Sequence, residues 1–102
     1  MSKFNARRTW SDSCQRWFAS KAEAIRGQEL FLMERASAIS HLEYQPKFIL
    51  CKEPRITITL DFAYLENGQR IYEDVKGVMT RDCRTKLAWL EQRYGIHVNL
   101  IR

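Results

Sequence analysis

The chain has 102 residues, of which 45% are hydrophobic and 12% aromatic, and it contains four Gly and two Pro. This size and composition predict one domain with a hydrophobic core, and they exclude disordered and collagen-like proteins. The 17 Lys and Arg residues outnumber the 12 Asp and Glu residues, which gives a formal charge of +5. The longest apolar runs, residues 30–33 and 48–51, are far shorter than the roughly 18–20 residues that span a membrane, so we expect a soluble protein with no membrane partner.

The basic residues are concentrated at the two ends of the chain. Residues 1–26 carry six basic and two acidic side chains and residues 79–102 carry five and two, whereas the segment between them is acidic overall. A basic surface attracts polyanions, and the commonest cytosolic polyanion is nucleic acid. The same charge also fits ordinary solubility, so charge alone leaves both interpretations open.

The cysteines indicate a reducing compartment. Cys14, Cys51 and Cys83 are odd in number and far apart in sequence, and no two of them form a Cys-x-x-Cys motif. This pattern predicts reduced thiols and neither a disulfide framework nor a zinc site. The basic start of the chain is not followed by an apolar stretch, so we expect no secretory signal and a cytoplasmic location.

A basic segment precedes the first predicted helix. Residues 1–17 have no clear periodicity, and we expect a basic arm or a short strand there, with strand character near residues 14–18. Ser20 and Glu23 have the spacing of a capping box, which predicts that a helix begins at Ser20. The helical spacing of apolar residues is lost after Ala36, where the helix should end.

Two strands are predicted after this helix. Alternation of apolar and polar residues predicts a strand over 41–51, although Pro46 inside it requires an edge position or a bulge. Every second residue from Ile56 to Tyr64 is apolar, which predicts one continuous strand over 55–64 with a single apolar face.

A hairpin turn and a return strand follow. Asn67 and Gly68 tolerate the positive φ angles of a type I′ turn, and the return strand should run over residues 70–76 until Gly77. Alternation along this strand places two sets of side chains on opposite faces: Tyr72, Asp74 and Lys76 on one, and Ile71, Glu73 and Val75 on the other.

The chain ends with a second helix and a closing strand. Apolar residues at helical spacing predict a helix over 81–94 that stops at Gly95, and alternation predicts a strand over 96–101. The order is therefore helix, strand, strand, strand, helix, strand. It predicts an α/β domain of two or three layers with a small mixed sheet.

Two carboxylates on the predicted hairpin are the best candidates for chemistry. A turn at Asn67-Gly68 pairs residues whose numbers sum to about 135, so Asp61 lies opposite Asp74. Facing carboxylates repel each other, and a divalent cation such as Mg²⁺ removes that cost by taking oxygen ligands from them and from a phosphate.

Lys76 shares a strand face with Asp74 and is placed to hold a water or a phosphate oxygen. Asp followed by Asp-x-Lys is thus compatible with phosphodiester hydrolysis. The same residues also fit a hairpin whose charged side faces solvent, with Lys76 offsetting the acids.

These residues resemble a known family. Leu60-Asp61 followed by Glu73-Asp74-Val75-Lys76, after a helix with an acidic cap, resembles the signature of the PD-(D/E)XK nuclease superfamily, although Leu60 replaces the proline that names the motif. More closely, the chain resembles a group of small phage and prophage endonucleases that are Holliday-junction-resolvase-like. The matching stretches are residues 18–26, 42–48, 61–64 and 72–77.

The resemblance implies a fold and a role for each matching residue. Residues 18–102 would form the nuclease-like domain with a restriction-endonuclease-like core. Asp61, Asp74 and the Val75 carbonyl would bind the metal, Lys76 would be the catalytic lysine, and Glu23 would be an acid that completes the catalytic and metal site. Glu23 fits equally well as the capping partner of Ser20.

The implied function is that of a Mg²⁺- or Mn²⁺-dependent DNA endonuclease in phage recombination or DNA processing, acting in the bacterial host cytoplasm. Branched DNA such as a four-way junction is the expected substrate, and a homodimer would present two sites to symmetric DNA. The expected DNA contacts are Gln45, Lys47, Arg81, Arg84 and Lys86. The alternatives are a non-catalytic nucleic-acid-binding module, with Trp10, Trp17 and Trp89 available for stacking, and an interaction domain that keeps the fold.

Overall fold

The computed structural model describes residues 7–102, so residues 1–6 of the expected arm lie outside the described part of the chain. The elements follow in the order β1 (Thr9–Ser11), β2 (Arg16–Phe18), α1 (Lys21–Arg35), β3 (Ser40–Tyr44), β4 (Lys47–Cys51), β5 (Ile56–Thr59), β6 (Phe62–Glu66), β7 (Gln69–Val75), α2 (Arg81–Tyr94) and β8 (Val98–Ile101).

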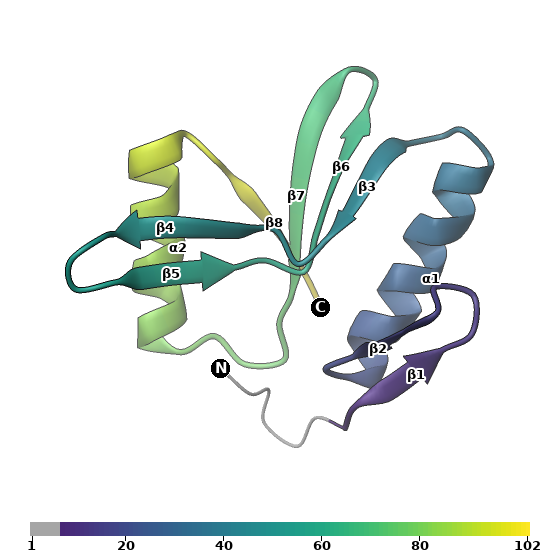
Figure 1. Cartoon of the computed structure of the whole chain (residues 1–102), viewed down its shortest axis with the longest axis horizontal. Helices are drawn as coiled ribbons and strands as arrows, with labels where there is room; N and C mark the ends of the chain where they lie inside the picture. The colour runs from purple at the N-terminus through teal and green to yellow at the C-terminus, as the bar shows by residue number, and fades with distance from the viewer. Residues whose placement is uncertain (1–6) are drawn as a thin grey trace.

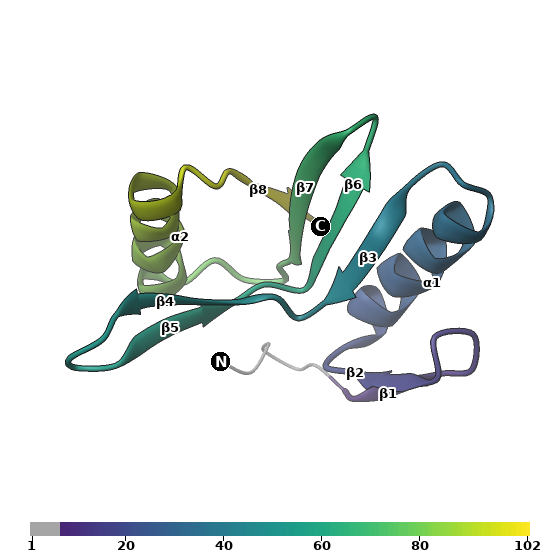
Figure 2. The same cartoon turned by 45° about the horizontal axis from the view of Figure 1, so that its top comes forward.

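The main sheet has four strands in the order β3-β6-β7-β8. The first three strands pair antiparallel and β8 pairs parallel to β7, so the sheet is mixed. Helices α1 and α2 lie on opposite sides of this sheet (Figures 1 and 2). Two smaller sheets, β1-β2 and β4-β5, complete an α/β fold with two helices and small mixed sheets.

The strands predicted over 41–51 and 55–64 are each divided in two, which corrects the expectation of two continuous strands. Their pairing nevertheless continues through the break, because the Gln45 N–H donates to the Asp61 carbonyl at 3.0 Å and the Leu60 N–H donates to the Pro46 carbonyl at 2.9 Å. Gln45 has a φ of 56°, and Pro46 has no N–H to continue a regular ladder. The result is one long hairpin that is bent in the middle.

The bend sends the two halves of the hairpin to different cores. Leu60, before the bend, belongs to a cluster with Leu50 and Leu90 between the β4-β5 sheet and α2. Phe62, after it, belongs to the cluster between the main sheet and α1. The single apolar face predicted from Ile56 to Tyr64 is therefore wrong, since the chain rotates at Asp61.

The β6-β7 hairpin has the predicted register. Phe62 pairs with Glu73 and Glu66 pairs with Gln69, as a turn at Asn67 and Gly68 requires. Both turn residues have positive φ, 54° and 77°, which is the geometry of a type I′ turn.

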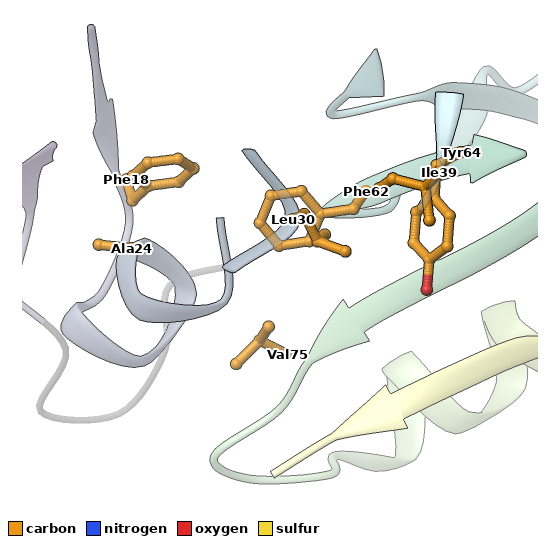
Figure 3. Packing of buried hydrophobic residues seen from close by; sticks show 7 residues of the cluster. All are labelled: Phe18, Ala24, Leu30, Ile39, Phe62, Tyr64 and Val75. Carbon is orange, nitrogen blue, oxygen red and sulfur yellow. The ribbon is translucent and has the colours of Figure 1, made fainter. Parts of the chain in front are cut away.

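The two faces of β7 contact different layers, as the alternation predicts. Val75 and Ile71 pack in the α1 cluster, and Tyr72 packs in the α2 cluster. Figure 3 shows the α1 cluster, in which Phe18 of β2 and Leu30 of α1 lie near side chains from the sheet.

The helix ends agree closely with their sequence signals. The Ser20 hydroxyl accepts a hydrogen bond from the Glu23 N–H at 3.1 Å, and α1 ends at the cap residue Ala36. Helix α2 begins after the cap residue Thr80 and ends at Gly95, whose φ of 69° is the left-handed conformation typical of a glycine stop.

Residues 9–18 form a two-stranded hairpin where the sequence predicts an arm or one short strand, and the expected domain boundary after residue 17 falls inside β2. Phe18 is buried against Gly27 of α1, and a Cβ at position 27 would lie 2.6 Å from Cζ of Phe18, so a larger residue there would force the ring to shift.

Cys14, Cys51 and Cys83 form no disulfide bond with one another, as expected. No helix among residues 7–102 is both long and apolar enough to cross a membrane.

Candidate active site

The bend of the long hairpin, the end of β7 and the first turns of both helices surround a cleft of about 400 Å³. Four of the expected catalytic residues line it: Glu23, Asp61, Asp74 and Lys76. The other lining residues are Ala19, Gln45, Thr57, Ile58, Thr59, Asp82, Cys83, Lys86 and Leu87. The fold therefore brings residues from five separate stretches of the sequence to one place: residues 19–23, 45, 57–61, 74–76 and 82–87.

Asp61 is positioned by the bend itself. Its carbonyl accepts from the Gln45 N–H at 3.0 Å, and its own N–H donates to the Glu73 carbonyl at 3.2 Å. Its carboxylate accepts a hydrogen bond from the Val75 N–H at 2.7 Å. The side chain is thus held against the end of β7, beside Asp74.

Asp74 is only 3% exposed. Burial and the negative charge of Asp61 raise the pKa of Asp74 to about 6, although the Lys76 ammonium acts in the opposite direction. A carboxylate this deeply buried does not face solvent, so that part of the alternative is wrong, whereas the expected pairing of Lys76 with the acids is present in the structure. The two acids form a pair in which each charge disfavours the other.

Lys76 supplies the compensating charge. Its Nζ lies 2.5 Å from Oδ2 of Asp74. Burial disfavours the ammonium, but the hydrogen bond and charge of Asp74 outweigh burial and raise the pKa of Lys76. The cleft therefore holds one ammonium and two carboxylates in direct interaction.

Glu23 is 2% exposed and lines the cleft from the first turn of α1. Its backbone N–H donates to Ser20, so the serine half of the predicted capping box is formed. The buried carboxylate lies in the wall shared with Asp61 and Asp74, where the resemblance places the helix-borne acid.

The expected DNA contacts divide into two groups. Gln45 and Lys86 line the cleft, with Lys86 Nζ 3.6 Å from Oδ2 of Asp82. Lys47, Arg81 and Arg84 are exposed but do not line it, and Arg84 borders a separate surface depression on α2.

The carboxylates of Asp61 and Asp74 can supply some, but not all, of the oxygen ligands of a hard cation. Carboxylate oxygens of Asp61 and Asp74 are the ligand type that Mg²⁺ takes, and their mutual repulsion is relieved by a positive charge between them. Within residues 7–102 no three His, Cys, Asp or Glu side chains gather closely enough to form a complete protein cage. Mg²⁺ commonly binds through one or two carboxylates and completes its shell with water and substrate phosphate, so the pair fits that mode.

A buried ion pair supports the cleft from the other face of the sheet. Arg26 of α1 donates to both carboxylate oxygens of Glu73, from Nε at 2.8 Å and from Nη2 at 2.7 Å. The Tyr64 hydroxyl also donates to Glu73, which is 2% exposed. Hydrogen bonding to Glu73 raises the pKa of Arg26, and burial together with Glu73 raises the pKa of Tyr64. This network joins α1 to β7 immediately beside Asp74.

Comparison with protein families matches residues 1–101 to the family described as Protein of unknown function (DUF1064). The chain belongs to this family. No curated protein and no solved structure matches the chain. The match covers the hairpin, both helices and the whole cleft, so these features all lie in the DUF1064 domain.

Two features of this DUF1064 protein were not predicted from the sequence. The first is Asp82, a further carboxylate at the cleft, which could have been noticed as an acidic residue in the first turn of the predicted second helix. The second is the Arg26–Glu73 ion pair. Glu73 lies between Ile71 and Val75 on an apolar strand face, and a charged residue in that place indicates a partner of opposite charge.

Proposed function

We propose that this protein is a metal-dependent DNA endonuclease that hydrolyses phosphodiester bonds at the cleft. The observation that carries the proposal is the convergence of Asp61, Asp74 and Lys76, in which two interacting carboxylates and one ammonium share a buried wall. Burying two carboxylates beside one ammonium costs desolvation energy and leaves one net negative charge, which a bound cation would offset. This arrangement is more typical of a catalytic centre than of a structural ion pair.

Each cleft residue would have a distinct role in hydrolysis. Asp61 and Asp74, with the Val75 carbonyl, would hold Mg²⁺ or Mn²⁺, and Glu23 would complete the site directly or through water. When bound, the cation supplies Lewis-acid stabilisation of negative charge on the phosphate. Lys76 would leave Asp74 and turn its ammonium to the phosphate oxygen on which charge develops.

The fold supports the same proposal. Helix α1, the bent hairpin, β7, α2 and β8 follow the order helix, strand, strand, strand, helix, strand once each bent strand is counted as one. That order is the one implied by a restriction-endonuclease-like core. We accordingly propose this core and a PD-(D/E)XK type of site for the domain.

The formal charge of +5 and the cleft residues Gln45 and Lys86 favour a polyanionic substrate. Branched DNA, a homodimeric enzyme and a cytoplasmic site of action in phage recombination or DNA processing are part of the proposal. Lys47, Arg81 and Arg84 would contact DNA outside the cleft.

Cleavage assays test the proposal directly. Single-stranded, duplex, flap and four-way-junction DNAs are incubated with the protein in Mg²⁺, in Mn²⁺ and in EDTA. Cleavage of at least one substrate is expected with metal and not with EDTA, and Asp74→Asn should abolish it. Glu66→Gln, which removes a charge at the opposite end of β6 from Asp61, is the matched control and should cleave normally. Metal-independent cleavage, or equal cleavage by Asp74→Asn, would contradict the proposal.

A non-catalytic DNA-binding module is the second candidate. It is favoured by one observation, since Lys76 already neutralises Asp74 through a direct ion pair. If the protein is such a module, no DNA in the panel is cleaved under any metal condition, while DNA binding persists in EDTA.

A further inference from the structure

The β1-β2 hairpin presents two tryptophans to solvent. Trp10 and Trp17 are directly paired across the hairpin, and they are 42% and 53% exposed. Their ring centroids lie 5.6 Å apart in an edge-to-face arrangement. Exposed aromatic side chains that lie together at the surface often mark an interaction site.

Arginine side chains accompany the aromatic rings. The Arg8 guanidinium lies 4.9 Å from the centre of the Trp17 ring, and the Arg16 guanidinium lies 3.7 Å from the centre of the Tyr44 ring. The neighbouring Asp12 accepts a hydrogen bond from the Trp10 indole at 2.8 Å. We name Arg8, Trp10 and Trp17 the tryptophan platform. Arg16 is paired with Ser11, so its side chain leaves the opposite face of the hairpin.

The platform is built on a fixed base. The opposite face of the hairpin is buried, with Ser11 and Phe18 at 0% and 3% exposure. Gln28 of α1 donates to the Ser11 hydroxyl at 3.2 Å, and the absence of a side chain at Gly27 lets the Phe18 ring lie against α1. A rigid aromatic surface loses little entropy when a flat ligand stacks on it.

The platform also adjoins the candidate active site. A small pocket of about 40 Å³ is lined by Arg16 and Trp17 from β2 and by Glu23, Gln45 and Asp61 from the cleft wall. The last three residues line the large cleft as well. Trp17 and three cleft residues therefore meet at this small pocket, which places the platform beside the cleft.

We propose that the tryptophan platform binds unpaired bases of a DNA strand whose next phosphates enter the cleft. Aromatic rings stack on bases of any sequence, and Arg8 supplies positive charge for the backbone of the same strand. Paired bases inside a duplex hide their faces, so the platform selects DNA with an unpaired segment. The role of the platform in cleavage rests on the proposed function, but its role in binding does not.

Binding in EDTA tests the platform without any catalytic step. Fluorescence anisotropy is measured with a labelled single-stranded oligonucleotide and with a blunt duplex of the same length, using Asp74→Asn protein throughout. The unpaired strand should bind more tightly than the duplex. Adding Trp10→Ala and Trp17→Ala should weaken single-strand binding by roughly 5- to 150-fold per lost stacking contact.

Two control variants define the interpretation. Trp17→Phe keeps an aromatic face and should retain most of the affinity, whereas Leu32→Ala removes an exposed apolar side chain outside the platform and should change nothing. Unchanged single-strand affinity in the double alanine variant would overturn the proposal. So would an equal loss of duplex and single-strand affinity.

A second measurement does not depend on the stability of the alanine variants. In Trp89→Phe protein the remaining indoles are Trp10 and Trp17, so their fluorescence reports the platform alone. Single-stranded DNA should quench this emission, and the absence of quenching at saturating DNA would overturn the proposal. If quenching occurs but no DNA is cleaved with Mg²⁺, the platform stands and the endonuclease proposal fails.

Discussion

Asp74 is a buried acid whose charge is opposed by its neighbour Asp61, so its ionisation should cost folding stability. Its pKa of about 6 in the folded protein lies above the ordinary value of 3.8. The folded state therefore binds this proton more tightly than the unfolded state. The resulting stability is present below about pH 3.8 and is lost as the pH rises to about 6.

Asp74→Asn should accordingly stabilise the metal-free protein at neutral pH. The difference in unfolding free energy between variant and wild type should grow between pH 4 and pH 7, by at most about 3 kcal/mol. Urea denaturation in EDTA at several pH values measures it. A difference that stays constant from pH 4 to pH 8 would show that Asp74 ionises in the fold as it does in the unfolded chain.

Lys76 distinguishes an enzyme from a binding module. If its ammonium stabilises charge that develops during hydrolysis, Lys76→Ala should lower the single-turnover cleavage rate by about 10²–10³-fold at saturating protein. Lys52→Ala removes an exposed lysine from the turn after β4 and should cleave like wild type. Equal cleavage rates for wild type, Lys76→Ala and Lys52→Ala would show that Lys76 has no catalytic role.

At the scale of elements, Gly27 fixes where the hairpin sits on α1. An alanine inside a helix ordinarily stabilises it by about 0.5–1 kcal/mol relative to glycine. Here a Cβ at position 27 would lie 2.6 Å from Cζ of Phe18, which is closer than real contacts allow. Steric crowding should therefore reverse the usual sign.

Gly27→Ala should destabilise the protein by roughly 1–3 kcal/mol in urea denaturation and should weaken single-strand binding if the hairpin shifts. Gly77→Ala is the matched control, because a Cβ there has no neighbour within 4 Å, and it should change stability by less than about 0.5 kcal/mol. An increase in stability for Gly27→Ala would mean that Phe18 does not lie against α1.

Local signals predicted the elements well where they act within a few residues. Ser20 and Gly95 are helix ends in the structure, and the Asn67-Gly68 turn set the pairing of β6 with β7. These features depend on backbone geometry close to the residue itself, which the residue type largely determines.

Pro46 gave a local signal for an edge position or a bulge, but the change of core at the bend could not be predicted in the same way. Alternation continues through Asp61, and only tertiary packing shows that Leu60 and Phe62 face different cores. The sequence placed Asp61 opposite Asp74, but the rotation that turns Asp61 into the cleft depends on both cores together. The Arg26–Glu73 pair is likewise a contact between distant residues, with no local pattern to give its partner.

On the scale of the whole molecule, positive charge should make DNA binding depend on salt. Log K should fall linearly with log salt, with a slope of about 0.9 for each phosphate contact on duplex DNA. Lys86→Ala should reduce the magnitude of that slope by about 0.9, the contribution of one phosphate contact, because Lys86 lines the cleft. Arg70→Ala serves as the control, since Arg70 pairs with Glu43 on the main sheet. A slope near zero for wild type would favour an interaction domain over a DNA-binding protein.

We propose that Asp61 and Asp74 share one divalent cation. Anomalous diffraction from crystals soaked in Mn²⁺ would locate that cation, and the result does not depend on the choice of DNA. We predict a peak within about 2.0–2.3 Å of an oxygen from each carboxylate, and its loss in Asp74→Asn crystals. A peak bound elsewhere, or no peak while Lys76 stays on Asp74, would contradict the claim.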